Sequence, residues 1–331
     1  MMAEHKGVMV FGEQKKGKIH KVTYELLGKA CELAAKLDEQ VYCCVVGPSG
    51  IQVDELIFRG ADKVFYVKDD DLFELPEVLT YAKNIVRVIE DVRPEICLFG
   101  ATSFGRSLAP RVAAALKCGL TADCTGLEID AGDGKLIQIR PAFSENILAH
   151  IKSKVLPQMS TVRYKEFDEA VRDSSRKGEV KTYEPIRIAD PMIEILEEIQ
   201  KEEFSIADAK VVVSAGKGLK SPEDFKLIRE LAEALGGVVG SSRPLVEEGF
   251  ISKAHQVGYS GNRVKPKLYV ACGVSGAPQH IAGMKESEMI FAINTDPSAP
   301  IFNIADYGIV GDLYEVVPKL IERINTRKDV Q

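Results

Sequence analysis

The first third of the chain alternates short apolar runs with longer amphipathic stretches. The apolar runs predict strands, at residues 8–11, 41–46, 64–67 and 96–99. The amphipathic stretches predict helices, at residues 22–37, 53–59, 76–92 and 105–117. Run 41–46 (VYCCVV) is apolar throughout, which is typical of a strand covered on both faces. We therefore expect βαβ units that build a parallel sheet with helices on its faces.

The pattern changes between about residue 120 and residue 165. Segments of period-two alternation are separated by glycines, and residues 130–134 (DAGDG) are typical of a turn between two strands. We expect here an antiparallel extension of the first sheet. Residues 165–191 are polar and irregular, and residues 193–203 indicate a short charged helix or a linker.

A second α/β block follows this linker. Strands are predicted at residues 210–213, 238–240, 268–271 and 289–293, and helices at residues 222–235, 279–284 and 311–324. The sequence thus predicts two α/β domains. The N-terminal domain, residues 1–195, holds a mostly parallel sheet. Residues 196–331 form a linker and a doubly wound C-terminal domain.

Composition and charge argue against several classes of function. With 331 residues, 45% of them apolar and 28% charged, the chain has the make-up of a folded globular protein. Its formal net charge of -6 favours neither nucleic acid nor an anionic membrane surface as a partner. No stretch has the apolar length of a membrane span or a signal peptide, so we expect no membrane insertion and a cytoplasmic or matrix-like reducing compartment.

Cysteine and histidine patterns point to neither disulfides nor metal. The seven cysteines are an odd set without a CxxC pair, and several lie in apolar runs, so buried reduced thiols are expected. His5, His20 and His150 lie far apart without ligand spacing, so no metal site is expected.

Glycine-rich loops at strand ends are the candidate binding segments. Residues 100–106 (GATSFGR) in the first domain could receive an anion, although an ordinary strand-to-helix turn explains them as well. In the second domain, residues 214–218 carry Lys217 but match neither common nucleotide-loop motif. Residues 240–244 place the permanent cation of Arg243 at a strand end. Residues 274–280 combine Ser275, a helix N-terminus and His280, a set that suits a phosphate-bearing ligand.

Several of these segments together resemble a known family. The stretches SSRPLVEEGF, QVGYSG, LYVACGVSGAPQHIAGM and AINTDPSAPIFNIADYGIVGDL resemble the FAD-binding domain of electron-transfer flavoprotein α subunits, in matching order across about residues 210–324. The resemblance implies FAD as cofactor and a heterodimer with a β subunit that the N-terminal domain contacts. It also implies electron transfer between an acyl-CoA dehydrogenase-type flavoenzyme and another redox partner.

The resemblance also implies a set of cofactor-binding residues. Arg243 would lie over the isoalloxazine ring with Ser242 beside it, and the Ser260 hydroxyl would lie near flavin N5. His280 would face the pyrimidine end, and Lys217 stands where relatives can carry an arginine. The ring and its tail would be lined by Gln256, Val257, Gly258 and Tyr259, the ribityl and pyrophosphate part by Ser275, Gly276, Ala277, Pro278 and Gln279, and the AMP half by Asn294, Asp312 and Leu313.

The chemistry of these residues agrees with an electron carrier. Reduction places negative charge on the N1–C2=O end of a flavin, and Arg243 together with a protonated His280 would stabilise it. Pro278 lacks the N–H that an aliphatic residue would offer there. No nucleophile–base pair and no set for proton abstraction from a substrate is evident, so no catalytic residues are assigned.

Two alternatives stay open at this stage. Some members of the family bifurcate electrons from NADH, sending one to ferredoxin or flavodoxin, and this chain alone does not decide whether its complex does so. A nicotinamide-dependent oxidoreductase subunit is the alternative from another class, because domains of this shape bind the phosphates of flavin and nicotinamide dinucleotides in the same way.

Overall fold

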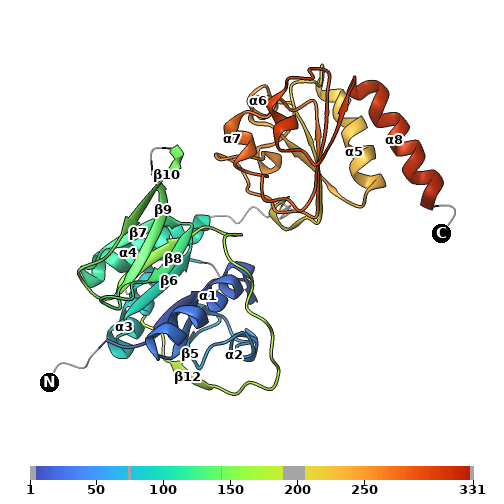
Figure 1. The fold of residues 1–331 in the computed structure, drawn as a ribbon. Coiled ribbons are helices and arrows are strands. Elements are labelled where there is room, and N and C mark those ends of the chain that lie inside the picture. The colour runs from blue at the N-terminus through green and yellow to red at the C-terminus, as the bar shows by residue number, and fades with distance from the viewer. Residues whose placement is uncertain (1–4, 74–75, 143, 189–205, 329–331) are drawn as a thin grey trace. The chain divides into compact units, whose positions relative to one another are not determined.

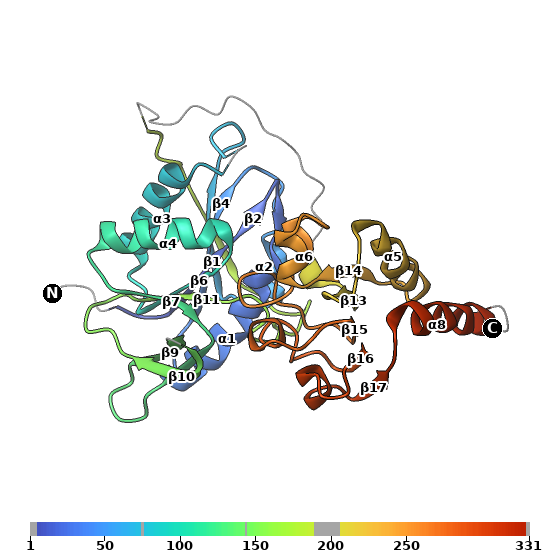
Figure 2. The ribbon, with the colours of Figure 1, turned by 90° about the horizontal axis from the view of Figure 1, so that it is seen from above.

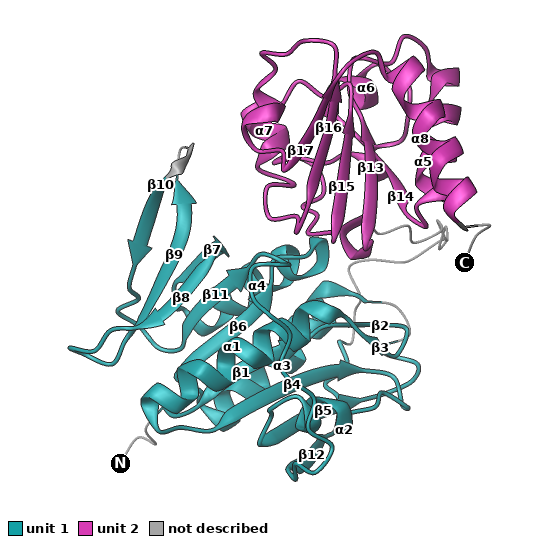
Figure 3. Cartoon of the chain, turned by 45° about the vertical axis from the view of Figure 1, so that its right-hand side comes forward, with its two compact units in different colours: residues 1–196 teal, residues 197–331 magenta. Residues whose placement is uncertain are grey.

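The computed structural model describes residues 5–73, 76–142, 144–188 and 206–328. The chain divides into two compact units, Met1–Leu196 and Glu197–Gln331 (Figure 3). Each unit is built around its own parallel β-sheet with its own buried core. The expected pair of α/β folds is confirmed.

Unit 1 contains a seven-stranded sheet in the order β12-β5-β4-β1-β6-β11-β7, and every neighbouring pair is parallel. The strands are β1 (Val8–Gly12), β4 (Val41–Gly47), β5 (Lys63–Lys68), β6 (Ile96–Gly100), β7 (Leu120–Cys124), β11 (Gln158–Val162) and β12 (Glu179–Tyr183). A small hairpin, β2 (Gln14–Lys15) and β3 (Lys18–Ile19), follows β1.

Helices cover both faces of this sheet (Figure 1). The helices α1 (Lys21–Leu37) and α2 (Asp54–Phe58) share one apolar core with the sheet. The helices α3 (Val78–Val92) and α4 (Ser103–Leu116) pack beside each other in a second core (Figure 2). The apolar strands 41–46 and 96–99 of the sequence are therefore buried on both sides, as their composition predicts.

The antiparallel strands form a separate sheet. The expectation that they extend the first sheet is therefore wrong. The three strands β8 (Gly126–Ile129), β9 (Leu136–Ala142) and β10 (Ser144–Ile151) pair in the order β10-β9-β8. The turn predicted at residues 130–134 does join β8 to β9. Because the parallel strands β7 and β11 need a long crossover between them, this small sheet serves as that crossover in place of a helix.

A strand in the segment 165–191 was missed by the sequence pattern. This strand, β12, pairs in parallel with β5 at the edge of the large sheet, and its first four residues are exposed. An edge strand of this kind needs no apolar run, so periodicity gives no signal for it. The helix or linker expected at residues 193–203 lies outside the described residues.

Unit 2 contains a five-stranded parallel sheet in the order β14-β13-β15-β16-β17. The strands are β13 (Val211–Ala215), β14 (Val238–Ser241), β15 (Leu268–Cys272), β16 (Ile290–Asn294) and β17 (Tyr307–Val310). On one face, α5 (Phe225–Ala234) and α8 (Leu313–Lys328) pack side by side (Figure 1). The other face is covered by loops and short helical turns.

Several short elements of unit 2 were not predicted. They are β17, the helix α6 (Arg243–Glu247), and the 3-10 turns η1 (Ile206–Asp208), η3 (Lys253–His255) and η4 (Pro300–Asn303). The predicted helix 222–235 begins as a separate 3-10 turn, η2 (Pro222–Asp224), before α5. The predicted helix 279–284 is the shorter α7 (Pro278–Ile281). Elements of three to five residues are too short for an amphipathic period to show.

The structure also bears on the cysteines and on the expectation of no membrane span. All seven cysteines are free thiols, five of them buried and two, Cys31 and Cys118, half-buried. Among the described residues, no helix combines the length and the apolar character that crossing a membrane requires.

Glu13 gives unit 1 a pH-dependent stability. It is buried at the end of β1, and burial raises its pKa from the ordinary 4.5 to about 7, although the Thr102 hydroxyl donates a hydrogen bond to it. Between pH 4.5 and pH 7 the folded state therefore keeps a proton that the unfolded chain releases. The free energy of unfolding should fall by about 3 kcal/mol as the pH rises through this window.

Urea unfolding followed by circular dichroism at several pH values checks this. The variant Glu13→Gln should lose this part of the pH dependence. Glu128→Gln, which changes an exposed glutamate of β8, should keep it. An unchanged pH slope in Glu13→Gln would contradict the assignment.

Candidate functional site

The site lies where the strand order of unit 2 reverses. From β13 the chain runs through α5 to β14 on one side, and from β15 it runs through α7 to β16 on the other side. The loops that leave the carboxyl ends of β13 and β15 therefore diverge and open a crevice between them. In open α/β sheets, ligands bind in this crevice.

Glycines let the two diverging loops touch at their start. A Cβ on Gly216 would lie 2.3 Å from the carbonyl oxygen of Gly273, and a Cβ on Gly218 would lie 2.8 Å from Gly273 Cα. Gly273 also has a φ of +62°, in the left-handed region that glycine adopts without strain. The backbone itself thus forms the floor of the crevice.

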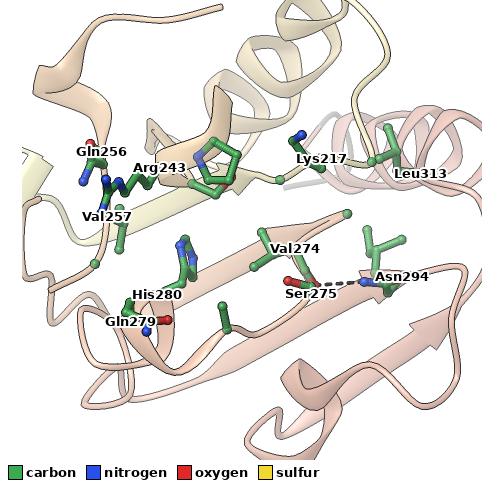
Figure 4. A pocket seen from close by; sticks show the side chains of 18 of the residues that line it. Lys217, Arg243, Gln256, Val257, Val274, Ser275, Gln279, His280, Asn294 and Leu313 are labelled. Carbon is green, nitrogen blue, oxygen red and sulfur yellow. Dashed lines mark hydrogen bonds between the residues drawn. The ribbon is translucent and has the colours of Figure 1, made fainter. Parts of the chain in front are cut away.

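Above this floor lies a cavity of about 730 Å³, within the range of about 300–1,000 Å³ that is usual for cofactor sites. Every cofactor residue predicted from the sequence lines it except Gly276 and Pro278 (Figure 4). The lining comes from all the loops at this edge of the sheet, including the long segment after β14 and the start of α8.

The two exceptions shape the turn that carries their neighbours. Gly276 has a φ of +86°, and a Cβ there would lie 2.3 Å from the backbone nitrogen of Ile301. Pro278 is the first residue of α7, where its missing N–H costs no helical hydrogen bond. Both residues therefore position Ser275, Ala277 and Gln279, which do line the cavity.

Sequence reasoning missed several lining residues, among them Lys220, Glu247, Thr295 and Tyr314. Thr295 directly follows Asn294 at the end of β16, so its place at a strand end was a usable signal. Glu247 lies one helical turn after Arg243 on α6, and this helix was not predicted.

Each of two cations at the cavity has an acidic partner from the end of α6. Arg243 Nε lies 2.8 Å from Glu247 Oε1, and Lys217 Nζ lies 2.6 Å from Glu248 Oε1. All four side chains are exposed, and ion pairs of this kind contribute only about 0–1 kcal/mol. Both cations are therefore available to an anionic ligand at small cost.

His280 is buried, and the expectation that it is protonated is wrong. Its ring points from α7 into the cavity (Figure 4). Burial lowers the pKa of His280 from 6.5 to about 4, although the backbone of Val257 opposes the shift. The imidazole is therefore neutral at pH 7.

Several of the remaining polar groups at the cavity have no hydrogen-bond partner among the described residues. The Ser242 hydroxyl is buried without a partner in the part of the chain that the structure describes, and so is Nδ1 of His280. Within the same described ranges, the backbone N–H groups of Ser275 and Ala277 have no hydrogen-bond acceptor. Such donors, together with the two cations, suit a large ligand that carries phosphates and carbonyl oxygens.

Two predicted amide side chains are engaged within the site. Gln256 Nε2 donates to Ser260 Oγ at 3.0 Å, which leaves the Ser260 hydroxyl proton available. Asn294 Nδ2 donates to the Val274 carbonyl at 2.9 Å and so ties the end of β16 to the loop after β15. No group of His, Cys, Asp and Glu side chains suited to a metal ion occurs in the described ranges.

Comparisons with known proteins point to one family. Residues 8–187 match the family described as "Electron transfer flavoprotein domain", and residues 205–285 match "Electron transfer flavoprotein FAD-binding domain". The chain is 46% identical over 333 residues to "Electron transfer flavoprotein subunit alpha" of Thermoanaerobacterium thermosaccharolyticum, which covers 99% of this chain and 100% of that protein.

Two further relatives carry other names. "Lactate dehydrogenase (NAD(+),ferredoxin) subunit LctC" of Acetobacterium woodii is 45% identical over 325 residues, covering 97% of this chain and 77% of the relative. "Protein FixB" of Clostridium saccharobutylicum is 43% identical over 323 residues, covering 97% of this chain and 96% of the relative.

The close approach of the loops can be tested by two glycine substitutions with the same backbone strain. Gly273→Ala adds a Cβ at a φ of +62° that meets Gly218 Cα at 2.8 Å, whereas Gly236→Ala adds one at a φ of +64° with nothing within 4 Å. Both should lose about 1 kcal/mol to the left-handed backbone. Gly273→Ala should lose clearly more, because it also forces the loops apart.

The free energy of unfolding of the two variants, measured in urea, tests this difference. Equal losses in Gly273→Ala and Gly236→Ala would mean that the contact between the loops does not contribute to stability.

Proposed function

Because the chain belongs to the family of electron transfer flavoprotein α subunits, we propose that it transfers electrons between an acyl-CoA dehydrogenase-type flavoenzyme and a second redox partner. Its cofactor is FAD. The α subunits of this family pair with a β subunit, so the proposed working unit is a heterodimer. Within it, residues 1–195 would contact the β subunit and residues 196–331 would supply the linker and the FAD site.

One observation carries the proposal for the site. The segment that matches the FAD-binding domain, residues 205–285, contains both loops of the glycine contact and also Arg243, Gln256 and His280. The cavity of unit 2 is therefore the natural place for FAD. Its donors and cations fit the phosphates and the ring carbonyls of that molecule.

The residues of this chain would bind and tune the cofactor. Bound FAD supplies reversible electron transfer. The guanidinium of Arg243 would offer fixed positive charge where reduction adds negative charge, and Glu247 would offset part of it. The free N–H groups of Ser275 and Ala277 would receive phosphate oxygens. No residue among these needs to act on a substrate, which agrees with an electron carrier.

A second candidate function follows from the 45% identity to LctC, whose name contains NAD(+) and ferredoxin. On this hypothesis the complex bifurcates electrons from NADH, with ferredoxin or flavodoxin as one acceptor. A second FAD would then be held by the β subunit. The nicotinamide-dependent alternative for this chain itself is set aside, because the cofactor of the family is FAD.

The role of Arg243 predicts a change in both affinity and potential. Arg243→Ala should weaken FAD binding about tenfold or more, the effect of losing a charged hydrogen-bond donor, and should make the flavin potential more negative. Arg229→Ala, which removes an exposed arginine from α5, should change neither quantity. Fluorescence titration with FAD and a redox titration measure the two effects. Unchanged values in Arg243→Ala would refute this role.

The two candidate functions predict different flavin counts. The heterodimer, co-expressed and purified, should release one FAD per pair if it is a simple electron carrier and two if it bifurcates. Absorbance of the released flavin against protein concentration gives the count. A colourless pair that takes up no added FAD would contradict both functions.

A further inference from the structure

A buried tyrosine lies directly behind the histidine of the site. Tyr269 stands within β15 and is fully enclosed, and its hydroxyl oxygen lies 2.9 Å from Nε2 of His280. The two rings meet edge to face, with centroids 6.2 Å apart. The other ring nitrogen of His280, Nδ1, makes no geometrically sound hydrogen bond in the described part of the chain, although the Val257 backbone lies close enough to the ring to raise its pKa, and the side chain lines the cavity.

A neutral imidazole carries its proton on one nitrogen only, and the partner of each nitrogen decides which. Burial raises the pKa of Tyr269 above its ordinary value, although a hydrogen bond with the buried Ser214 hydroxyl opposes the shift, so the tyrosine hydroxyl keeps its proton and can donate it. If the hydroxyl donates to Nε2, that nitrogen is the acceptor and the ring proton resides on Nδ1. The unpartnered nitrogen at the cavity is then a donor.

A donor at this position complements the cofactor. The N1–C2=O end of a flavin presents a ring nitrogen and a carbonyl oxygen, and both are acceptors. A donor to this end is favoured further when reduction adds negative charge there, even though the imidazole itself is neutral. An acceptor nitrogen at the same place would be repelled.

We propose that Tyr269 is a positioning residue that donates to Nε2 of His280, holds the imidazole in its Nδ1–H form and so presents an N–H to the flavin. The inference rests on the proposed function in one respect, that FAD occupies the cavity of unit 2. The link between Tyr269 and His280 is internal to this chain and can be measured with or without FAD.

Nitrogen NMR of histidine-labelled heterodimer, with His280→Gln used to assign the signal, measures the tautomer. Wild-type protein should show the Nδ1–H form of His280 both with and without FAD. Tyr269→Phe removes only the hydroxyl and should let the ring shift toward the Nε2–H form. FAD affinity should then fall about 2- to 10-fold, the loss of one hydrogen bond, and the flavin potential should become more negative.

Tyr81→Phe is the matched control. It removes the hydroxyl of another buried tyrosine, which lies in unit 1 and accepts a hydrogen bond from Gln14 at 2.9 Å. Tyr81→Phe should leave the tautomer, the FAD affinity and the potential unchanged. A purely structural effect of losing a buried hydroxyl would instead act on FAD without moving the His280 tautomer.

The outcomes are distinguishable. An Nε2–H form in wild-type protein, or an unchanged tautomer in Tyr269→Phe, overturns the inference even if FAD binding weakens. If Tyr269→Phe does not fold, the tautomer of the wild-type protein alone decides. If the wild-type heterodimer takes up no FAD, the proposed function fails, and the tautomer of the FAD-free protein still tests the Tyr269–His280 link.

Discussion

The site of unit 2 depends on a contact between two stretches of backbone. Where the loops after β13 and β15 separate, Gly216 and Gly218 lie against Gly273 so closely that a side chain at either position would collide. A floor made of backbone brings polar N–H groups to the base of the cavity without side chains in between. The cavity, its donors and its cations are all arranged above this contact.

The charges at the cavity are nearly balanced before any ligand binds. Arg243 and Lys217 are each paired with a glutamate from the end of α6, and His280 is neutral. A net positive cavity would attract any anion. A cavity with balanced charges favours a ligand that also satisfies the buried, unpartnered polar atoms of Ser242 and His280, so specificity comes from shape and hydrogen bonding more than from charge.

The parts of the fold that the sequence predicted are those with a strong local signal. Buried strands such as β4 appear as unbroken apolar runs, and long helices such as α3 appear as amphipathic ones. The edge strands β12 and β17 were missed, because exposed residues break the pattern. The attachment of the antiparallel sheet was wrong, since alternation within a strand does not say which sheet it joins.

The candidate site likewise has features that could be predicted from the sequence and features that could not. Glycine and helix-start signals located the loops, and almost every predicted residue lines the cavity. Protonation of His280 could not be predicted, because it depends on β15 and α7 enclosing the ring. The partner of Arg243 was missed because Glu247 becomes its neighbour only when α6 forms.

Among the residues that the structure describes, no long helix covers the face of the C-terminal sheet opposite α5 and α8. The apolar core on that face includes Val257 and Val274, which also line the cavity. The same loops thus seal hydrophobic side chains from water and, on the proposed function, would hold the FAD. Ligand binding to these loops and the stability of this face are thermodynamically linked. A ligand that binds only the folded loops raises the melting temperature of the apolar layer that they cover. Retention of the cofactor and resistance to proteolysis then become two measures of one equilibrium.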